Sequence, residues 1–276
     1  MIRLIGIDID GTLLDSRGQM PPANGEAIRE AVAAGIHVAL VTGRSYPFAR
    51  PVAEPLPASI TLIVSSGAVE RGTDGSTLAR RLLSREAAQT VLEATREFRH
   101  AAALIFDRDR ERQMVHETMD WNHPGRHAYW LRNQSFISKA EQRLEDELVE
   151  DPIEVMFNGG VDDMRALASV LRAAAGDTFA VSLTEYVHRD FSLVDITAPT
   201  ATKGQALAWR AAQLGLQRDQ IMAVGDNFND LEMLEAAGTP VVMANAVDGL
   251  KARGWHLTGH QDEAGLAEAI RRFALG

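Results

Sequence analysis

The chain has 276 residues, of which 46% are hydrophobic and 24% are charged, a balance typical of globular rather than disordered proteins. The net charge of −10 argues against electrostatic binding of nucleic acid, and the absence of cysteine excludes disulfides, thiolate metal sites and cysteine nucleophiles. No segment approaches the roughly 20 apolar residues that span a bilayer, and the N-terminus lacks the regions of a secretory leader. We therefore expect a soluble, cytoplasmic protein.

The first third of the chain alternates between strand-like and helix-like segments. Apolar runs predict strands at residues 4–9, 36–41 and 60–64, because runs without polar alternation are typical of strands buried on both faces. Helices are expected over residues 24–34 and from about Ser45. This βαβαβ order predicts an α/β fold with a doubly wound, mostly parallel, Rossmann-like sheet. In such sheets, ligands bind at the carboxyl ends of the strands.

The composition changes between Ser84 and Ser192, where arginine, glutamate and histidine become frequent. Three stretches there have a helical composition: residues 86–98, 139–149 and 162–174. Residues 178–194 predict a hairpin that turns at Thr184-Glu185, whereas residues 121–138 give no clear pattern and are expected to form a long loop. We therefore expect an α+β module over residues 84–192, inserted into a core domain of residues 1–83 and 193–276.

After Pro199 the α/β alternation returns. Helices are predicted over 204–214, 231–237 and 264–273, and strands over 220–224 and 240–243. Polar clusters now stand at four predicted strand ends or helix starts: Asp8/Asp10, Thr42/Arg44, Lys203 and Asp226/Asn229/Asp230. Carboxylates at the end of a buried strand are unfavourable unless a cation pairs with them, so the clusters predict a cation-binding site at one edge of the sheet.

The order of these clusters resembles that of the haloacid dehalogenase-like superfamily of aspartyl-nucleophile phosphotransferases. Asp-Ile-Asp-Gly-Thr-Leu at 8–13 is similar to the first motif, Thr-Gly-Arg at 42–44 to the second, Thr-Lys-Gly at 202–204 to the third and Gly-Asp-Asn-Phe-Asn-Asp at 225–230 to the fourth. The inserted module lies where this superfamily carries its type II cap. Met-Ala-Asn-Ala at 243–246 resembles a segment of the Cof-type, subfamily IIB, sugar-phosphate phosphatases, so the resemblance implies a HAD-like core with a type IIB cap domain.

The resemblance also implies a Mg²⁺-dependent phosphatase that hydrolyses a small phosphorylated metabolite such as a sugar phosphate. Asp8 would attack phosphorus and form an aspartyl-phosphate, which splits a very slow hydrolysis into two easier steps. Asp10 would act as the general acid and base. Mg²⁺ would be held by Asp8, the backbone carbonyl of Asp10 and Asp226, with Asn229 and Asp230 as supporting residues.

By the same resemblance, Thr42 and the backbone N–H of Gly43 would hydrogen-bond the phosphoryl group. Lys203 would neutralise the nucleophile and the phosphate. Arg44 and Asn229 are further candidates for substrate binding, although a surface salt bridge is an equally good explanation of Arg44.

Other candidate residues are less well marked by the sequence. Ser66-Gly67-Ala68 stands where the Cof-type pattern usually has Asn-Gly-Ala, so we expect the chemistry to be retained and the substrate preference to shift. In the cap, His188, Arg189 and Asp190 are candidates for substrate contact, although a solvated strand edge explains them as well.

Two alternatives stay open. A phosphomutase or phosphonatase relative would share the core motifs, but a phosphonatase is expected to use a cap lysine, and Lys139 is the only lysine in the predicted cap. A non-catalytic phosphoacceptor switch would share an aspartate, a threonine and a lysine, but it has no need for Asp10 or for a cap of about a hundred residues. We expect a small phosphorylated substrate and no nucleic-acid or membrane partner, and either a monomer or a dimer is compatible with the sequence.

Overall fold

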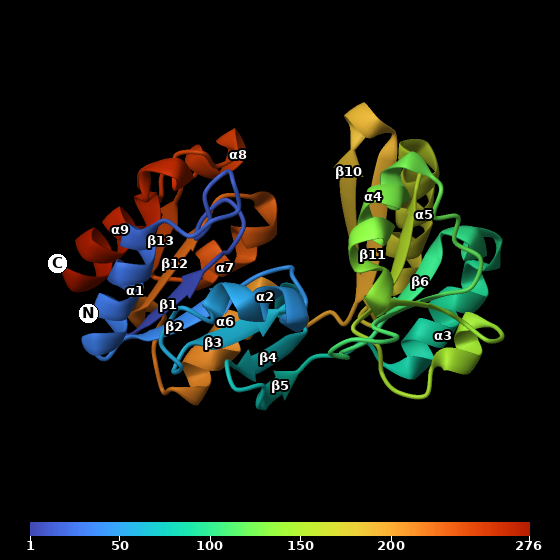
Figure 1. Ribbon diagram of the computed structural model, residues 1–276, viewed down its shortest axis with the longest axis horizontal. Coiled ribbons are helices and arrows are strands. Elements are labelled where there is room, and N and C mark those ends of the chain that lie inside the picture. Colours follow the sequence, from blue (N-terminus) through green and yellow to red (C-terminus); the bar gives the residue numbers. More distant parts are fainter. The chain divides into compact units, whose positions relative to one another are not determined.

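The computed structural model describes all 276 residues and divides them into two compact units. Residues 1–80 and 200–276 form the core unit, which combines the blue and red parts of the chain in Figure 1. Residues 81–199 form the inserted unit. The second boundary falls later than the expected position after Ser192, because the strand Phe191–Thr197 still pairs within the sheet of the inserted unit.

The sheet of the core unit has eight strands in the order β14-β13-β12-β1-β2-β3-β4-β5. Their bounds are β1 Leu4–Ile7, β2 His37–Val41, β3 Thr61–Val64, β4 Val69–Gly72, β5 Thr77–Arg80, β12 Ile221–Gly225, β13 Thr239–Val242 and β14 His256–Leu257. The pairings from β14 to β3 are parallel, and β4 and β5 add an antiparallel edge. The predicted doubly wound, mostly parallel sheet is confirmed. Ile7 pairs with both Leu40 and Val224, so β1, β2 and β12 end level with one another.

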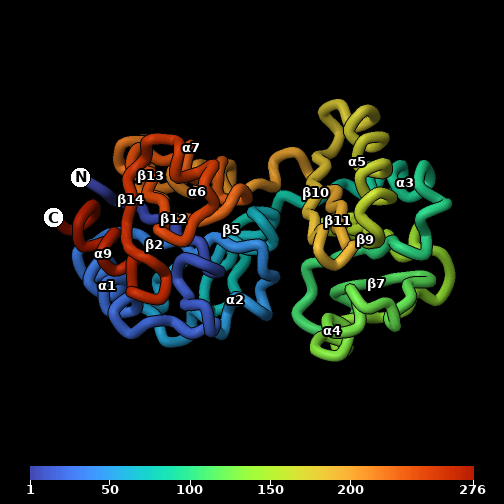
Figure 2. The backbone as a smooth tube through the Cα atoms, turned by 90° about the horizontal axis from the view of Figure 1, so that it is seen from above, coloured from blue at the N-terminus to red at the C-terminus, as the bar shows by residue number.

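Helices cover both faces of the core sheet (Figure 2). Their bounds are α1 Pro22–Ala33, α2 Tyr46–Ala53, α6 Lys203–Gln213, α7 Leu231–Ala236, α8 Asp248–Lys251 and α9 Gly265–Ile270. Helices α6 and α7 lie on one face, where Ala206, Leu207 and Ala211 pack against Ala39 and Ile63 of the strands, and α1 and α9 lie on the other. None of the chain's helices is long and apolar enough to cross a membrane.

The inserted unit is an α+β module with a six-stranded sheet in the order β10-β11-β9-β6-β7-β8. The bounds are α3 Arg85–Ala94, β6 Ala102–Ile105, β7 Met114–His116, α4 Pro124–Asn133, β8 Ile137–Lys139, β9 Glu154–Gly159, α5 Val161–Ala175, β10 Ala180–Tyr186 and β11 Phe191–Thr197. Helices α3 and α5 cover one face, and α4 lies on the opposite side of the sheet (Figure 2). Because side chains alternate along a strand, Val155 and Phe157 face α3 and α5, whereas Met156 and Asn158 face α4.

The long loop predicted over residues 121–138 is wrong, because this segment contains α4 and β8. Proline is compatible with the first turn of a helix, where its missing N–H is not needed. Pro124 takes that position, and the side chain of His123 caps the helix by accepting the N–H of Gly125 at 3.1 Å. The first turn of α4 is therefore regular, although its polar sequence does not indicate a helix.

Two further predictions in this unit are wrong. Residues 139–149 form no α-helix, and only a short 3₁₀ turn is present at Leu144–Glu147. The hairpin turns at 187–190 rather than at Thr184-Glu185, because β10 continues through those residues to Tyr186. Glu185 accepts a hydrogen bond from Arg165 of α5 at 2.5 Å, so its charge is accommodated within the strand rather than in a turn.

Candidate active site

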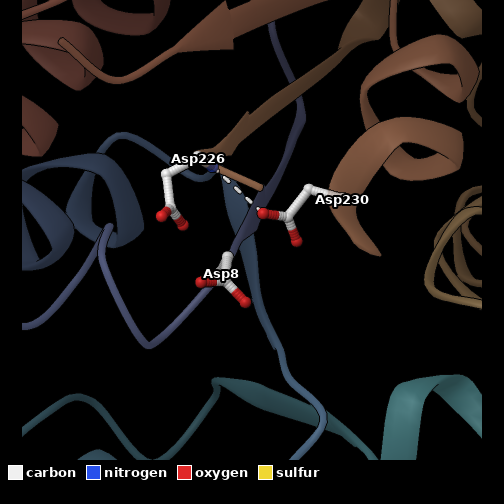
Figure 3. Close-up of side chains that lie close together, drawn as sticks. All are labelled: Asp8, Asp226 and Asp230. Atoms are coloured by element: carbon white, nitrogen blue, oxygen red, sulfur yellow. Dashed lines mark hydrogen bonds between the residues drawn. The ribbon is translucent and has the colours of Figure 1, made fainter. Parts of the chain in front are cut away.

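Four charged side chains from three distant segments meet at the carboxyl ends of the core strands. Asp8 follows β1, Asp226 and Asp230 follow β12, and Lys203 is the first residue of α6. The Nζ of Lys203 lies 2.5 Å from Oδ1 of Asp8 and 2.6 Å from Oδ1 of Asp230. The three carboxyl groups each bring one oxygen within 4.8 Å of the others, and Figure 3 shows them converging.

This cluster carries more negative than positive charge. With all groups ionised, three carboxylates and one ammonium leave a net charge of −2. Burial raises the pKa of Asp8 well above its usual value, and Lys203 offsets this only in part. Burial, followed by the neighbouring Asp230, raises the pKa of Asp226 to about 6. Burial alone would lower the pKa of Lys203, but Asp8 and Asp230 outweigh it and raise that pKa. The site therefore favours an added cation.

The hydrogen bonds distinguish the carboxylates that are free from the one that is engaged. Asp230 accepts Lys203 on Oδ1, and on Oδ2 it accepts the backbone N–H groups of Asp226 at 3.0 Å and Asn227 at 3.2 Å. Oδ2 of Asp8 accepts no hydrogen bond, and the carboxylate of Asp226 accepts only the Thr12 hydroxyl, at 3.4 Å. Asp8 and Asp226 therefore offer free oxygens to a ligand, whereas Asp230 fixes the position of Lys203 and of the loop after β12.

Gly11 allows Asp226 to approach the end of β1. Its φ of +89° is unfavourable for other residues, and a Cβ at this position would lie 2.7 Å from Cγ of Asp226. Asn245 donates from Nδ2 to the carbonyl of Gly11 at 2.8 Å and holds this turn. The role of Asn245 was signalled by the Met-Ala-Asn-Ala segment, but the buried Thr12 was missed, although it lies within the first motif.

The carboxylate of Asp10 does not join the cluster. It accepts Nε of Arg44 at 2.8 Å and Nη2 of Arg44 at 2.5 Å, and its side chain is 60% exposed. These hydrogen bonds raise the pKa of Arg44. The structure thus shows the ion pair that was one of the two explanations of Arg44, and the partner is a predicted catalytic residue.

Thr42 and the Ser66-Gly67 turn lie at the ends of β2 and β3. The buried Thr42 accepts the N–H of Arg44 on Oγ1 at 3.1 Å, and its carbonyl accepts the N–H of Ser66 at 3.0 Å. Ser66 has a φ of +55°, a conformation that asparagine adopts more readily than serine. Gly67, at +104°, packs against the carbonyl group of Thr202, where a Cβ would lie 2.6 Å from the carbonyl carbon.

The remaining candidates differ in their surroundings. Gly43 and Asn229 are exposed, and Asn229 makes no side-chain hydrogen bond to the charged cluster. In the inserted unit, His188 is exposed and Arg189 lines a cavity. Asp190 accepts the N–H of Val161 at 3.0 Å, so it caps α5.

Comparisons with known proteins agree with this geometry. Residues 5–270 match the model of a family described as haloacid dehalogenase-like hydrolase. The chain is 28% identical over 276 residues to 5-amino-6-(5-phospho-D-ribitylamino)uracil phosphatase YcsE of Bacillus subtilis, covering 99% of this chain and 96% of that protein. It is 29% identical over 282 residues to the chloroplastic endoribonuclease YBEY of Arabidopsis thaliana, covering 97% of this chain but 46% of that protein, so it spans about half the length of this relative. Among solved structures, the HAD subclass IIB sugar phosphatase BT4131 shares the fold with a TM-score of 0.76 and 18% identity, covering 99% and 100% of the two chains.

Proposed function

Since the chain belongs to the haloacid dehalogenase-like hydrolase family, we propose that it is a Mg²⁺-dependent phosphatase of a small phosphorylated metabolite, with Asp8 as its nucleophile. The proposal is carried by Lys203, whose buried ammonium group contacts the carboxylates of both Asp8 and Asp230. A fixed positive charge beside the nucleophile reduces the repulsion between its carboxylate and a phosphate dianion. Without such a charge, two anions would have to approach each other in a buried site.

The proposed reaction has two steps, in which Asp8 and Asp10 take part. In the first, a carboxylate oxygen of Asp8 attacks phosphorus, the bond from phosphorus to the ester oxygen breaks, and Asp10 gives a proton to the leaving alkoxide. In the second, Asp10 takes a proton from water, the water oxygen attacks phosphorus, and Asp8 is released together with inorganic phosphate. Both oxygens of Asp10 accept from Arg44, so proton transfer by Asp10 requires this ion pair to open.

The residues present fit a divalent cation, because the cluster has a net charge of −2 and free oxygens on Asp8 and Asp226. Carboxylate and carbonyl oxygens are the ligands that Mg²⁺ prefers. We infer that Asp8, Asp226 and the backbone carbonyl of Asp10 would hold it, with Asn229 and Asp230 in support. Bound there, Mg²⁺ would neutralise charge on the phosphoryl oxygens.

A second group of residues is suited to holding the phosphate itself. We assign Thr42, the backbone N–H of Gly43 and Lys203 to the phosphoryl oxygens, and Ser66 and Gly67 to the turn that faces them. A phosphate on a sugar-like chain is the substrate class we propose, because the name of YcsE describes a phosphorylated ribityl chain.

The test is phosphate release from a panel of phosphate monoesters in the presence of Mg²⁺. We expect Asp8→Asn to lower kcat/KM by about 10³-fold or more and Asp10→Asn to lower it by about 10²- to 10⁴-fold. Asp248→Asn, a change at a fully exposed carboxylate, serves as the control and should leave kcat/KM unchanged. Turnover that persists in Asp8→Asn would refute the mechanism. Stable phosphorylation of Asp8 without phosphate release would instead support the phosphoacceptor switch.

A further inference from the structure

The inserted unit contains a cavity of about 550 Å³ between α4 and the sheet face opposite α3 and α5. It is lined by residues of β7, β9, β10 and β11 and of α4 and its flanking turns. Four large aromatic rings contribute to the wall: Trp121, Tyr129, Tyr186 and Phe191. A cavity of this size and lining accommodates a small organic ligand. All of the lining residues belong to the inserted unit.

The aromatic wall is held in place by close packing. A Cβ on Gly125, in the first turn of α4, would lie 2.8 Å from Cε2 of Phe191, so only glycine lets the ring lie against the helix. The rings of Phe191 and Tyr186 are stacked, with centroids 6.4 Å apart and an angle of 28°. The ring of His123 lies against Phe191 at 6.0 Å. The wall therefore offers flat faces in fixed positions, which favours stacking of another flat group.

A buried cation faces the same cavity. Arg126 is 6% exposed and donates to the side-chain oxygen of Asn158, to the carbonyl of Asn158 at 2.5 Å and to the carbonyl of Asp120 at 3.3 Å. These bonds use three of the five N–H donors of a guanidinium. No carboxylate lies within ion-pair distance of Arg126, and burial lowers its pKa, which Asp120 offsets only in part. Two donors and an uncompensated charge thus remain for an oxygen acceptor.

Two further arginines add positive charge and hydrogen-bond donors to the cavity. Arg132 and Arg189 line the cavity, and neither forms an ion pair with a carboxylate. The carboxylates of Glu154 and Asp195 lie on the same face of the sheet but do not line the cavity. The lining as a whole therefore combines aromatic faces with hydrogen-bond donors.

We propose that this cavity binds a planar aromatic or heteroaromatic ring that carries oxygen acceptors. Flat rings stack on aromatic side chains whatever their substituents, and carbonyl or carboxylate oxygens match the free donors of Arg126. A polyol without a ring would use the donors but leave the aromatic wall unpaired.

Ring binding is tested with probes that carry no phosphate. Riboflavin and uridine are titrated into the full chain by calorimetry, against ribitol and ribose, which lack the ring. We expect at least one ring probe to bind about tenfold or more tightly than its ring-free partner, in line with the contribution of stacking on one aromatic side chain. Tyr186→Ala should remove this difference and Tyr186→Phe should keep it. Val187→Ala, a change at an exposed neighbour outside the cavity lining, should leave it unchanged.

Binding of neither ring probe more tightly than its ring-free partner would overturn this inference. A difference that persists unchanged in Tyr186→Ala would also overturn it. Either result would leave the proposed phosphatase function intact.

Discussion

Replacing Asp226 by asparagine should stabilise the metal-free protein, although it removes a carboxylate from the proposed metal site. In the folded state the charge of Asp226 is opposed by burial and by the neighbouring Asp230, which together raise its pKa to about 6. Asparagine has the same shape, can still accept the Thr12 hydroxyl that now reaches Oδ1, and carries no charge. The substitution therefore removes an unfavourable charge with little change in packing.

The magnitude follows from the pKa difference. The folded protein holds the proton of Asp226 more tightly than the unfolded chain, so this group's stabilising contribution is complete below the ordinary pKa of 3.8 and is lost as the pH rises through about 6. A difference of about 2 in pKa corresponds to ~3 kcal/mol, which solvent screening at this partly exposed group reduces to ~1–2 kcal/mol. We expect Asp226→Asn to raise the free energy of unfolding by that amount at about pH 8, and by almost nothing at about pH 4.

Urea unfolding in the presence of a chelator measures this free energy at both pH values. Asp230→Asn is the matched control, because the same chemical change there removes the charge that faces Lys203 and leaves one acceptor oxygen where Lys203 and two backbone N–H groups now use two. It should lower the free energy of unfolding by ~3–5 kcal/mol, as expected when one partner of a buried ion pair is removed. The electrostatic reasoning would be refuted if Asp226→Asn destabilised the metal-free protein at about pH 8, or if its effect did not depend on pH.

Three other outcomes follow from the same structure. Chelation should abolish phosphate release and Mg²⁺ should restore it, with calorimetric Mg²⁺ affinity decreasing as the pH falls through about 6, because Asp226 must lose its proton to bind a metal. Lys203→Met should abolish turnover and lower the free energy of unfolding by ~3–5 kcal/mol in urea titrations, since two buried carboxylates lose their counter-charge. Gly67→Ala should destabilise by ~3 kcal/mol or more because its Cβ meets the backbone, whereas Gly18→Ala, with a similar φ sign and open space, should cost only ~1 kcal/mol in thermal unfolding.

The core unit could be predicted in some detail because its physical signals are local. Buried parallel strands give uninterrupted apolar runs, and Ile7, Leu40 and Val224 end such runs level with one another. The proximity of Asp8 and Asp226 follows from that register, since both residues come directly after a strand end. The pairing of Asp10 with Arg44 could not be chosen from the sequence, because a partly exposed arginine three residues after a strand has many possible partners.

The inserted unit was harder to predict because its signals depend on tertiary packing. Helix α4 begins at Pro124 and buries only Arg126 and Asn133, so its sequence lacks the apolar face by which a helix is recognised. Position 125 requires glycine because the ring of Phe191, 66 positions further along the chain, packs on it, and the sequence gives no sign of that contact. Likewise, the sequence does not show that Arg126 lacks an ion pair. This follows from its hydrogen bonds to the neutral oxygens of Asn158 in β9.

The central claim, that Asp8 attacks phosphorus, is tested most directly by trapping the phosphorylated enzyme. A hydrolysed phosphate monoester is mixed with the protein in the presence of Mg²⁺, the reaction is quenched in acid within a single turnover, and the phosphorylated residue is identified by mass spectrometry. The mechanism predicts one acid-stable acyl phosphate on Asp8, absent from Asp8→Asn. A phosphoryl group on another residue, or turnover with no phosphorylated enzyme at any quench time, would contradict it.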